Sequence, residues 1–204
     1  MSSRRSLRNR MRSRRKALAP REQRRHALQL ARNFTCSPLF LRCRSLAVYL
    51  AADGEIDPAP LVERVRRAGM RVFLPVLRPR PSRALWFTEY PPGTLLRRNR
   101  FGIPEPDIRR QRSVPPWGLD LVLMPLVAFD PQYNRLGMGG GFYDRTLASL
   151  LRRRYWHRPR LIGLAHELQR VPALTAAGWD VPLDAVITEQ GFYPRQLPPQ
   201  ANSR

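Results

Sequence analysis

The chain has 204 residues, of which 43% are hydrophobic, a composition that supports a packed core and argues against wholesale disorder. This length suits one compact soluble domain, and no apolar run approaches the ~20 residues that a transmembrane helix needs. The formal net charge is +22 and Lys16 is the only lysine, so arginine supplies almost all of the positive charge. Such a charge attracts anions and excludes no fold.

The first eighteen residues are rich in Arg and Ser and contain no acid. Mitochondrial transit peptides have this composition, whereas a secretory signal needs an apolar stretch that is missing here. Apolar residues nevertheless recur at helical spacing, so we expect two helices broken near Pro20. Their predicted inner stripes are Leu7, Met11 and Leu18 in the first helix and Ala27, Leu28, Ala31 and Phe34 in the second.

The middle of the chain alternates short apolar runs with turn signals. Ser45–Ala51 has the length of a buried strand, and Asp53–Gly54 marks a turn. Pro60–Ala68 is typical of a helix that ends at a left-handed Gly69. Further strands are predicted at Arg71–Pro75 and Ala84–Tyr90, and the Pro-rich and Gly-rich stretch Pro91–Pro116 is predicted to be mostly loop.

The second half contains the strongest strand prediction, Asp120–Phe129. A glycine-rich segment follows it, and then a helix over Asp144–Arg153 with Leu147, Leu150 and Leu151 on its inner side. Two more strands are expected at Leu161–Ala165 and Ala185–Ile187. Apolar strands that alternate with helices favour an α/β fold with a mainly parallel sheet covered on both faces. We expect one domain over 1–192 and a flexible tail over 193–204.

The cysteines and histidines give no sign of a metal site. Cys36 and Cys43 lack the spacing of a zinc motif and are expected to be reduced thiols. His26, His157 and His166 are scattered along the chain, so we expect no metal cluster from them.

Four of five consecutive positions in the glycine-rich segment are glycine: Gly137, Gly139, Gly140 and Gly141. Each glycine costs about 0.5–1 kcal/mol more than alanine to order in regular structure, so a role that offsets this cost is expected. Backbone N–H groups without Cβ atoms suit phosphate, and open α/β sheets bind ligands between a strand and the following helix. Neither a Walker loop nor a dinucleotide fingerprint fits, because no Lys-Ser or Lys-Thr follows and Phe142 stands where the fingerprint needs Gly or Ala. A surface loop without a ligand is the alternative.

Two neighbouring segments, Asp120–Asp130 and Asn134–Arg145, closely resemble the 5-formyltetrahydrofolate cyclo-ligase family, also called 5,10-methenyltetrahydrofolate synthetases. Weaker matches occur in the same order as in that family at Arg4–Arg8, Tyr49–Asp57, Phe101–Pro106 and Asp180–Thr188. The resemblance implies a three-layer α/β fold of the NagB/RpiA/CoA-transferase-like type. It also implies ATP- and Mg²⁺-dependent closure of 5-formyltetrahydrofolate, with or without a polyglutamate tail, to 5,10-methenyltetrahydrofolate. The γ-phosphoryl group first activates the formyl oxygen, N10 then attacks, and ADP and phosphate are released.

By resemblance, two segments bind ATP. One is Arg4–Arg8 with Arg4, Arg5, Ser6, Leu7 and Arg8, and the other is Arg135–Tyr143 with Arg135, Leu136, Gly137, Met138, Gly139, Gly140, Gly141, Phe142 and Tyr143. Arg8, Arg135 and Asp144 are the expected catalytic residues. The family usually has Lys in place of Arg4, and some relatives have Lys in place of Gly140. A solvated basic helix face is the alternative for the two arginines of the first segment.

The resemblance also assigns the folate and metal contacts. Leu50, Glu55, Met138, Gly139, Gly140, Gly141 and Phe142 are expected to contact the folate. Asp144 and Asp180 are the expected Mg²⁺ ligands, since carboxylates beside phosphates suit a hard cation. The alternatives are a first-turn helix acid for Asp144, a turn residue for Asp180 and a solvated acid for Glu55.

The amino terminus belongs to the mature protein if Arg4 and Arg8 bind ligands, so we expect a cytoplasmic monomer without a membrane or a specific nucleic-acid partner. A basic nucleic-acid-binding protein is the alternative, suggested by arginine-dense stretches at 4–25, 97–112 and 152–160. The sequence lacks the usual nucleic-acid-binding signatures. Another nucleotide-using transferase on the same scaffold is a third possibility.

Overall fold

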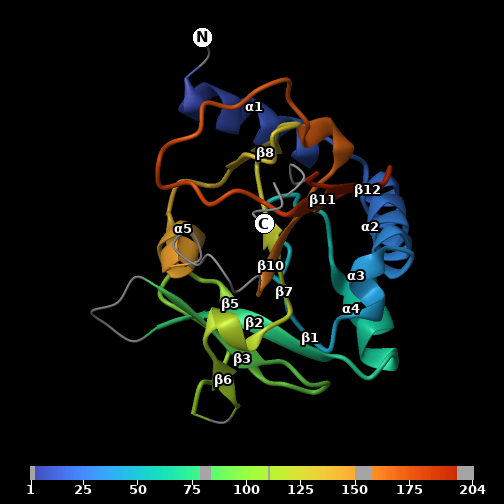
Figure 1. Cartoon of the computed structure of the whole chain (residues 1–204), viewed down its shortest axis with the longest axis vertical. Coiled ribbons are helices and arrows are strands. Elements are labelled where there is room, and N and C mark those ends of the chain that lie inside the picture. The colour runs from blue at the N-terminus through green and yellow to red at the C-terminus, as the bar shows by residue number, and fades with distance from the viewer. Residues whose placement is uncertain (1–2, 79–83, 110, 150–157, 197–204) are drawn as a thin grey trace, which may run out of the picture.

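The computed structural model describes residues 3–78, 84–109, 111–149 and 158–196. Within them, one mixed sheet runs through the molecule (Figure 1). Its strands in spatial order are β12 (Phe192–Pro194), β11 (Ala185–Ile187), β10 (Arg160–Leu164), β7 (Leu121–Pro125), β1 (Ser45–Ala47), β2 (Arg71–Leu77), β3 (Leu85–Glu89) and β6 (Ser113–Val114). The five central strands, β11 to β2, are parallel, and the strands beyond them are antiparallel. The mainly parallel sheet is therefore confirmed.

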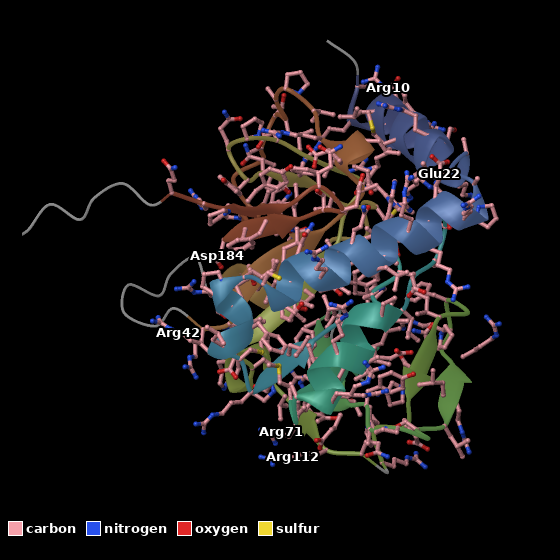
Figure 2. The ribbon with its side chains drawn as sticks, turned by 90° about the vertical axis from the view of Figure 1, so that its right-hand side faces the viewer. Arg10, Glu22, Arg42, Arg71, Arg112 and Asp184 are labelled. Carbon is pink, nitrogen blue, oxygen red and sulfur yellow. The ribbon has the colours of Figure 1, made fainter. Side chains whose placement is uncertain are left out.

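Two long helices cover one face of the sheet. The α-helices of the described residues are α1 (Arg4–Lys16), α2 (Pro20–Thr35), α3 (Pro38–Leu41), α4 (Ala59–Arg67) and α5 (Phe142–Leu147). Figure 2 shows α2 and α4 lying across the sheet on the same side. Leu30 and Phe34 of α2 and Leu61 of α4 are fully buried against alternate strand residues such as Leu121 and Leu123. Burial of each such side chain contributes about 1.5–3 kcal/mol.

The opposite face is covered by α5 and by connecting segments. In Figure 1, α5 lies across the sheet from α2 and α4. Leu147 of α5 is fully buried with Val122 and Met124, which are the β7 residues that point away from α2. Both faces of β7 are thus apolar, which explains its continuous hydrophobic sequence. The three-layer arrangement is confirmed.

Helix α1 stands apart from these layers, across one end of the sheet (Figure 1). Its N-cap is Ser3, whose hydroxyl accepts a hydrogen bond from the Ser6 N–H at 3.2 Å. Met11 is buried in a small cluster with Val127 and Leu136. One side of α1 is therefore fixed by apolar packing, and arginines such as Arg5, Arg10 and Arg14 lie exposed on its other sides.

The predicted strand Asp120–Phe129 is interrupted. β7 ends at Pro125, and Ala128–Phe129 forms β8, which pairs with β9 (Arg135–Leu136) in a separate hairpin. Proline has no N–H to continue a ladder, and the Leu126 carbonyl accepts side-chain hydrogen bonds from Arg15 and Gln169 instead of a strand. The chain is thereby turned out of the sheet just before the glycine-rich segment.

The region Pro91–Pro116 contains more structure than expected. A hairpin forms from β4 (Leu96–Arg98) and β5 (Pro104–Pro106), and β6 follows before the turn η1 (Pro116–Gly118). Gly102 has φ of +74° at the hairpin bend, where L side chains are strained. Three-residue strands leave almost no periodic signal in a sequence.

Four smaller predictions are corrected. Strand β1 ends at Ala47, before the predicted Ala51, and α1 ends at Lys16, before Leu18. Leu28 is 47% exposed, and Leu30 takes its place on the buried stripe of α2. Helix α5 begins at Phe142, two residues before the predicted start. Its predicted end, with Leu150 and Leu151, lies outside the described residues.

The C-terminal part of the chain is ordered further than the predicted tail allows. Tyr193 and Pro194 belong to β12 and pair with β11, so order continues past residue 192. Residues 197–204 lie outside the described part. No helix in the described residues has the length and apolarity that crossing a membrane requires.

Candidate functional site

A cavity of about 1400 Å³ opens at the carboxyl edge of the parallel strands. Leu50 follows β1, Pro75 lies in β2 and Pro125 ends β7, and all three line it. From β1 the chain crosses to β2 on one side, and from β7 it crosses to β10 on the other. The connections therefore diverge between β1 and β7, the kind of position where open α/β sheets bind ligands.

The glycine segment, Gly137–Gly141, forms one wall of this cavity. Gly139 has φ of +102° and Gly141 has φ of +63°, both conformations that L side chains rarely adopt. A Cβ on Gly141 would lie 2.7 Å from Nη1 of Arg145, too close to be accommodated without a shift. The segment therefore needs glycine for its backbone path as well as for exposure of its N–H groups.

Helix α1 sends two arginines into the cavity. Arg4 forms an ion pair with Asp180 at 2.6 Å, and Arg8 donates from Nε to the Gly137 carbonyl at 2.8 Å. The other predicted ATP contacts on α1 lie elsewhere: Arg5 and Ser6 are exposed, and Leu7 packs on the Met11 cluster. Of the described α1 residues, Arg4 and Arg8 line the cavity.

The two predicted metal ligands lie side by side at the glycine end of the cavity. Asp144, in the first turn of α5, pairs with Arg135 and also accepts a 3.4 Å hydrogen bond from the Val181 N–H. Asp180, next to Val181, pairs with Arg4 and accepts from the Ala177 N–H at 2.9 Å. The structure thus brings together acids from segments 36 residues apart (180 − 144) and balances them with arginines.

Arg135 is nearly buried, with 4% of its side chain exposed. Its Nε has no hydrogen-bond acceptor among the described residues. A buried donor of this kind costs about 1–3 kcal/mol when left unpaired. Leu136, its predicted neighbour in the ATP site, is buried in the Met11 cluster and does not line the cavity.

The predicted folate contacts Leu50 and Glu55 line the same cavity. Glu55 is only 13% exposed, accepts from the Ala52 N–H at 3.2 Å and lies 3.7 Å from the buried Arg15. Burial raises the pKa of Glu55, and Arg15 partly opposes that rise. Burial and the Glu55 charge raise the pKa of the Tyr143 phenol, which therefore stays protonated and can donate a hydrogen bond.

Apolar side chains at the cavity complete a wall that we did not predict. Phe101, Ile103 and Trp179 line it and are 56%, 54% and 71% exposed. Phe101, on the β4–β5 hairpin, meets Phe142 edge-to-face at 5.9 Å. The resemblance had included Phe101–Pro106 without a role for any member. Exposed aromatic residues beside a cavity suit a flat ring system as ligand.

A second group that we did not predict anchors α1. The Asp53 carboxylate pairs with Arg12 at 2.6 Å, with Arg15 at 2.9 Å and with Lys16. Arg15 is fully buried, although arginine is rarely so, and it also donates to the Asp53 carbonyl at 2.8 Å. Hydrogen bonds from Arg12, followed by those from Lys16 and Arg15, hold the pKa of Asp53 well below its usual range. The sequence hints at this group only through spacing: Arg15 follows Met11 by four residues and so lies on the same face of the helix.

Comparison with known proteins identifies the family of the chain. The model of the 5-formyltetrahydrofolate cyclo-ligase family matches residues 1–189. The chain is 43% identical over 180 residues to the 5-formyltetrahydrofolate cyclo-ligase of Escherichia coli strain K12, covering 87% of this chain and 96% of that protein. For the Haemophilus influenzae enzyme the identity is 42% over 144 residues, covering 70% and 74%. The solved structure of Aquifex aeolicus 5,10-methenyltetrahydrofolate synthetase has a TM-score of 0.78 at 28% identity, covering 98% and 99%.

Proposed function

Because the chain belongs to the 5-formyltetrahydrofolate cyclo-ligase family, we propose that its cavity converts 5-formyltetrahydrofolate to 5,10-methenyltetrahydrofolate at the expense of ATP. The observation that carries this proposal is that Arg4, Arg8 and Arg135 line one cavity together with the glycine segment, while apolar side chains line other parts of it. A polyphosphate fits the cationic end, and a pterin fits the rest.

The phosphate end has the required chemistry. Arg8 is already held against the glycine segment, and a guanidinium there can turn its remaining donors to phosphate oxygens. Arg135 also lines the cavity and supplies a second guanidinium at this end. Gly139 has open space apart from the Arg8 guanidinium, whose carbon would lie 3.6 Å from an added Cβ. Phosphate can therefore approach the backbone closely at this point.

Mg²⁺ also fits this end of the cavity. Asp144 and Asp180 are the carboxylates that would hold it, with phosphate and water oxygens in the remaining positions. The bound ion would neutralise charge that develops on the transferred phosphoryl group. Both carboxylates are balanced by Arg135 and Arg4 in its absence, so the arginines would be released toward the phosphates when the ion binds.

The folate end is defined by the buried carboxyl of Glu55 and by apolar walls. The donor edge of a pterin suits a carboxylate acceptor, and Tyr143 supplies a donor nearby. Leu50 and Phe142 offer apolar surface on either side of this position, and Phe101 extends the wall. In this proposal the pterin lies deep in the cavity, and the glutamate tail extends toward solvent and the basic surface.

The proposed reaction has two steps. The formyl oxygen attacks the γ-phosphorus of ATP, an O–P bond forms, and the bond to ADP breaks. N10 then attacks the formyl carbon and loses its proton, and the C–O bond breaks to release phosphate and leave the methenyl bridge. Phosphorylation is needed because an amide-like oxygen is a poor leaving group. The protein's part is to align the two substrates and to neutralise charge.

The test is the rise in near-ultraviolet absorbance of the methenyl product with purified protein, 5-formyltetrahydrofolate, ATP and Mg²⁺. Activity should require ATP, and Asp144→Asn should lose most of it without rescue by added Mg²⁺. A folded sample that shows no turnover under these conditions would rule the proposal out. Wild-type kinetics for Asp144→Asn would remove that residue from the site. We further propose that the enzyme acts as a cytoplasmic monomer, which sedimentation of the purified chain tests in part.

A further inference from the structure

Two histidines that we expected to be unrelated lie in contact in the fold. Nδ1 of His26, on α2, is 3.0 Å from Nδ1 of His166, which follows β10. Glu189, after β11, brings a carboxylate oxygen to 3.7 Å from the same His26 nitrogen. The ligand atoms of all three residues lie within 4.8 Å of one another. His157 lies outside the described residues, whereas His26 and His166, which are scattered in the sequence, lie together in the fold.

The cluster is enclosed and held by its surroundings. His166 is fully buried, and about a tenth of the His26 and Glu189 side chains is exposed. The backbone N–H of His166 donates to Oε1 of Gln169 at 2.9 Å. The second carboxylate oxygen of Glu189 accepts from the Glu167 N–H at 3.0 Å, which leaves the oxygen facing His26 available.

Hydrogen bonding explains only part of this arrangement. A proton on one Nδ1 can join the two imidazoles at 3.0 Å. The 3.7 Å separation between His26 Nδ1 and Oε1 of Glu189 is too long for a hydrogen bond. The Glu189 carboxylate therefore lies near two ring nitrogens without a hydrogen bond to His26. Zinc–ligand bonds of about 2.0–2.1 Å in tetrahedral geometry place ligand atoms roughly 3.4 Å apart. The two observed separations lie on either side of that value.

We propose that His26, His166 and Glu189 form a binding site for a divalent transition metal, with Zn²⁺ the best match. Two imidazoles and one carboxylate are an established zinc ligand set, and the fourth position is left to water. Imidazole ligands favour zinc, whereas the carboxylates near the glycine segment favour Mg²⁺. The two sites therefore differ in chemistry and in position.

A metal at this place would join three separate parts of the fold. His26 belongs to α2, His166 begins the turn η3 (Glu167–Gln169), and Glu189 lies in the turn before β12. The turn η3 packs against α1. Since a metal that binds only the folded chain stabilises it, zinc should raise the unfolding temperature.

The experiment uses the full chain, stripped with a chelator, without ATP or folate. Zinc is titrated in competition with a chromophoric chelator, and Co²⁺ replaces it for absorption spectra. One equivalent should bind, with a cobalt spectrum that lacks thiolate charge transfer, and unfolding should shift upward in temperature. His166→Gln and Glu189→Gln should each weaken zinc by more than the roughly 10–100-fold that loss of an outer-shell partner costs. Cys36→Ser and His157→Gln serve as controls and should bind like wild type.

Failure of the wild-type chain to bind one equivalent of zinc overturns the proposal, whether or not any variant folds. Binding that survives both ligand variants, or that Cys36→Ser abolishes, also overturns it. Neither result bears on the cyclo-ligase proposal, because no folate or nucleotide is present. Conversely, an inactive enzyme that binds zinc through these residues would leave the metal site standing.

Discussion

Gly141 shows how a single residue fixes the shape of the phosphate end. It has φ of +63°, and an added Cβ would lie 2.7 Å from Arg145 Nη1. We expect Gly141→Ala to raise the KM for ATP about 10–100-fold, because the left-handed backbone strains an alanine, the segment shifts, and one charge-assisted hydrogen bond of about 1.5–3 kcal/mol is lost. Steady-state kinetics with varied ATP measures this.

Gly93 is the matched control for that substitution. It has φ of +77°, and nothing lies within 4 Å of an added Cβ. Gly93→Ala therefore carries the left-handed backbone cost of about 1–2 kcal/mol without touching the cavity. Both variants should lose similar stability, and only the Gly141 variant should lose ATP affinity. Equal KM values for ATP in the two variants would contradict a phosphate role for the glycine segment.

Glu55 predicts how folate binding depends on pH. Burial raises its pKa, and the proposed contact needs the carboxylate form. Folate affinity should therefore fall as the pH is lowered, starting above the ordinary glutamate value of about 4.3. Glu55→Gln should bind folate more weakly and with little pH dependence in this range. Equilibrium binding of 5-formyltetrahydrofolate from neutral to acidic pH is the measurement.

The same residue gives a prediction of opposite sign for stability. A carboxyl whose pKa is higher in the folded than in the unfolded state stabilises the fold below the unfolded pKa, and this contribution is lost as the pH rises through the folded pKa. At neutral pH, Glu55→Gln should therefore unfold no more easily than wild type. Marked destabilisation at neutral pH would instead indicate that the ion pair with Arg15 dominates.

At the scale of elements, the attachment of α1 depends on Asp53. The carboxylate holds Arg12, Arg15 and Lys16, while Arg4 and Arg8 at the other end of the helix reach the cavity. Gly54 allows the close approach, since an added Cβ would meet the backbone of α1 at 3.2 Å. The loop after β1 thus helps to position both arginines of α1 that line the cavity.

We expect Asp53→Asn to destabilise the chain by about 3 kcal/mol at neutral pH, because the buried Arg15 loses its nearest carboxylate and keeps only Glu55, at 3.7 Å. It should also raise the KM for ATP. The pKa of Asp53 is lowered in the fold, so its contribution is present above the unfolded value of about 3.9 and is lost as the pH falls through the folded value. The stability gap should narrow below about pH 4 in urea unfolding experiments.

An exposed ion pair gives the control for Asp53. Glu63 and Arg67 pair on the surface of α4 with 68% and 75% exposure. Glu63→Gln should cost less than about 1 kcal/mol and should leave the KM for ATP unchanged. If Asp53→Asn behaves in the same way, Asp53 does not position α1.

The elements themselves were predictable where the sequence signal is local. The apolar runs Leu121–Met124, Leu161–Leu164 and Ala185–Ile187 each lie in a buried parallel strand. The paired strands Leu96–Arg98 and Pro104–Pro106 were missed because three residues carry too little periodicity, and because proline suggests a loop. Local pattern therefore finds the central strands of the main sheet and misses short strands such as β4 and β5.

The site is less local than the fold. Gly137–Gly141 stands out in the sequence, and the resemblance supplied Arg8, Glu55 and Asp144, all of which line the cavity. By contrast, Arg15 contacts Asp53 across 38 residues, and the two clustered histidines are 140 residues apart. Contacts of this kind depend on how helices and loops meet in space, so no periodicity or motif in the sequence predicts them.

For the molecule as a whole, the positive charge is spread widely and is not confined to the cavity. Arg10 lies at one end of the molecule and Arg71 and Arg112 at the other (Figure 2). A formal charge of +22 draws ATP and folate toward the protein, but it attracts RNA in the same way.

The single-domain expectation stays a prediction, since the described residues have gaps.

Salt separates these two effects of the charge. RNA held by scattered arginines is bound through counterion release, so its affinity should fall steeply, by roughly 10³-fold or more if six or more phosphates are contacted, between 50 and 200 mM salt. ATP bound beside Arg135 should be screened less, because that side chain is nearly buried and salt screens buried charges less than exposed ones. The KM for ATP should therefore change far less over the same range. Fluorescence anisotropy with single-stranded RNA, run beside the absorbance assay, makes the comparison. An RNA complex that tolerates 200 mM salt would instead indicate a built nucleic-acid interface on this surface.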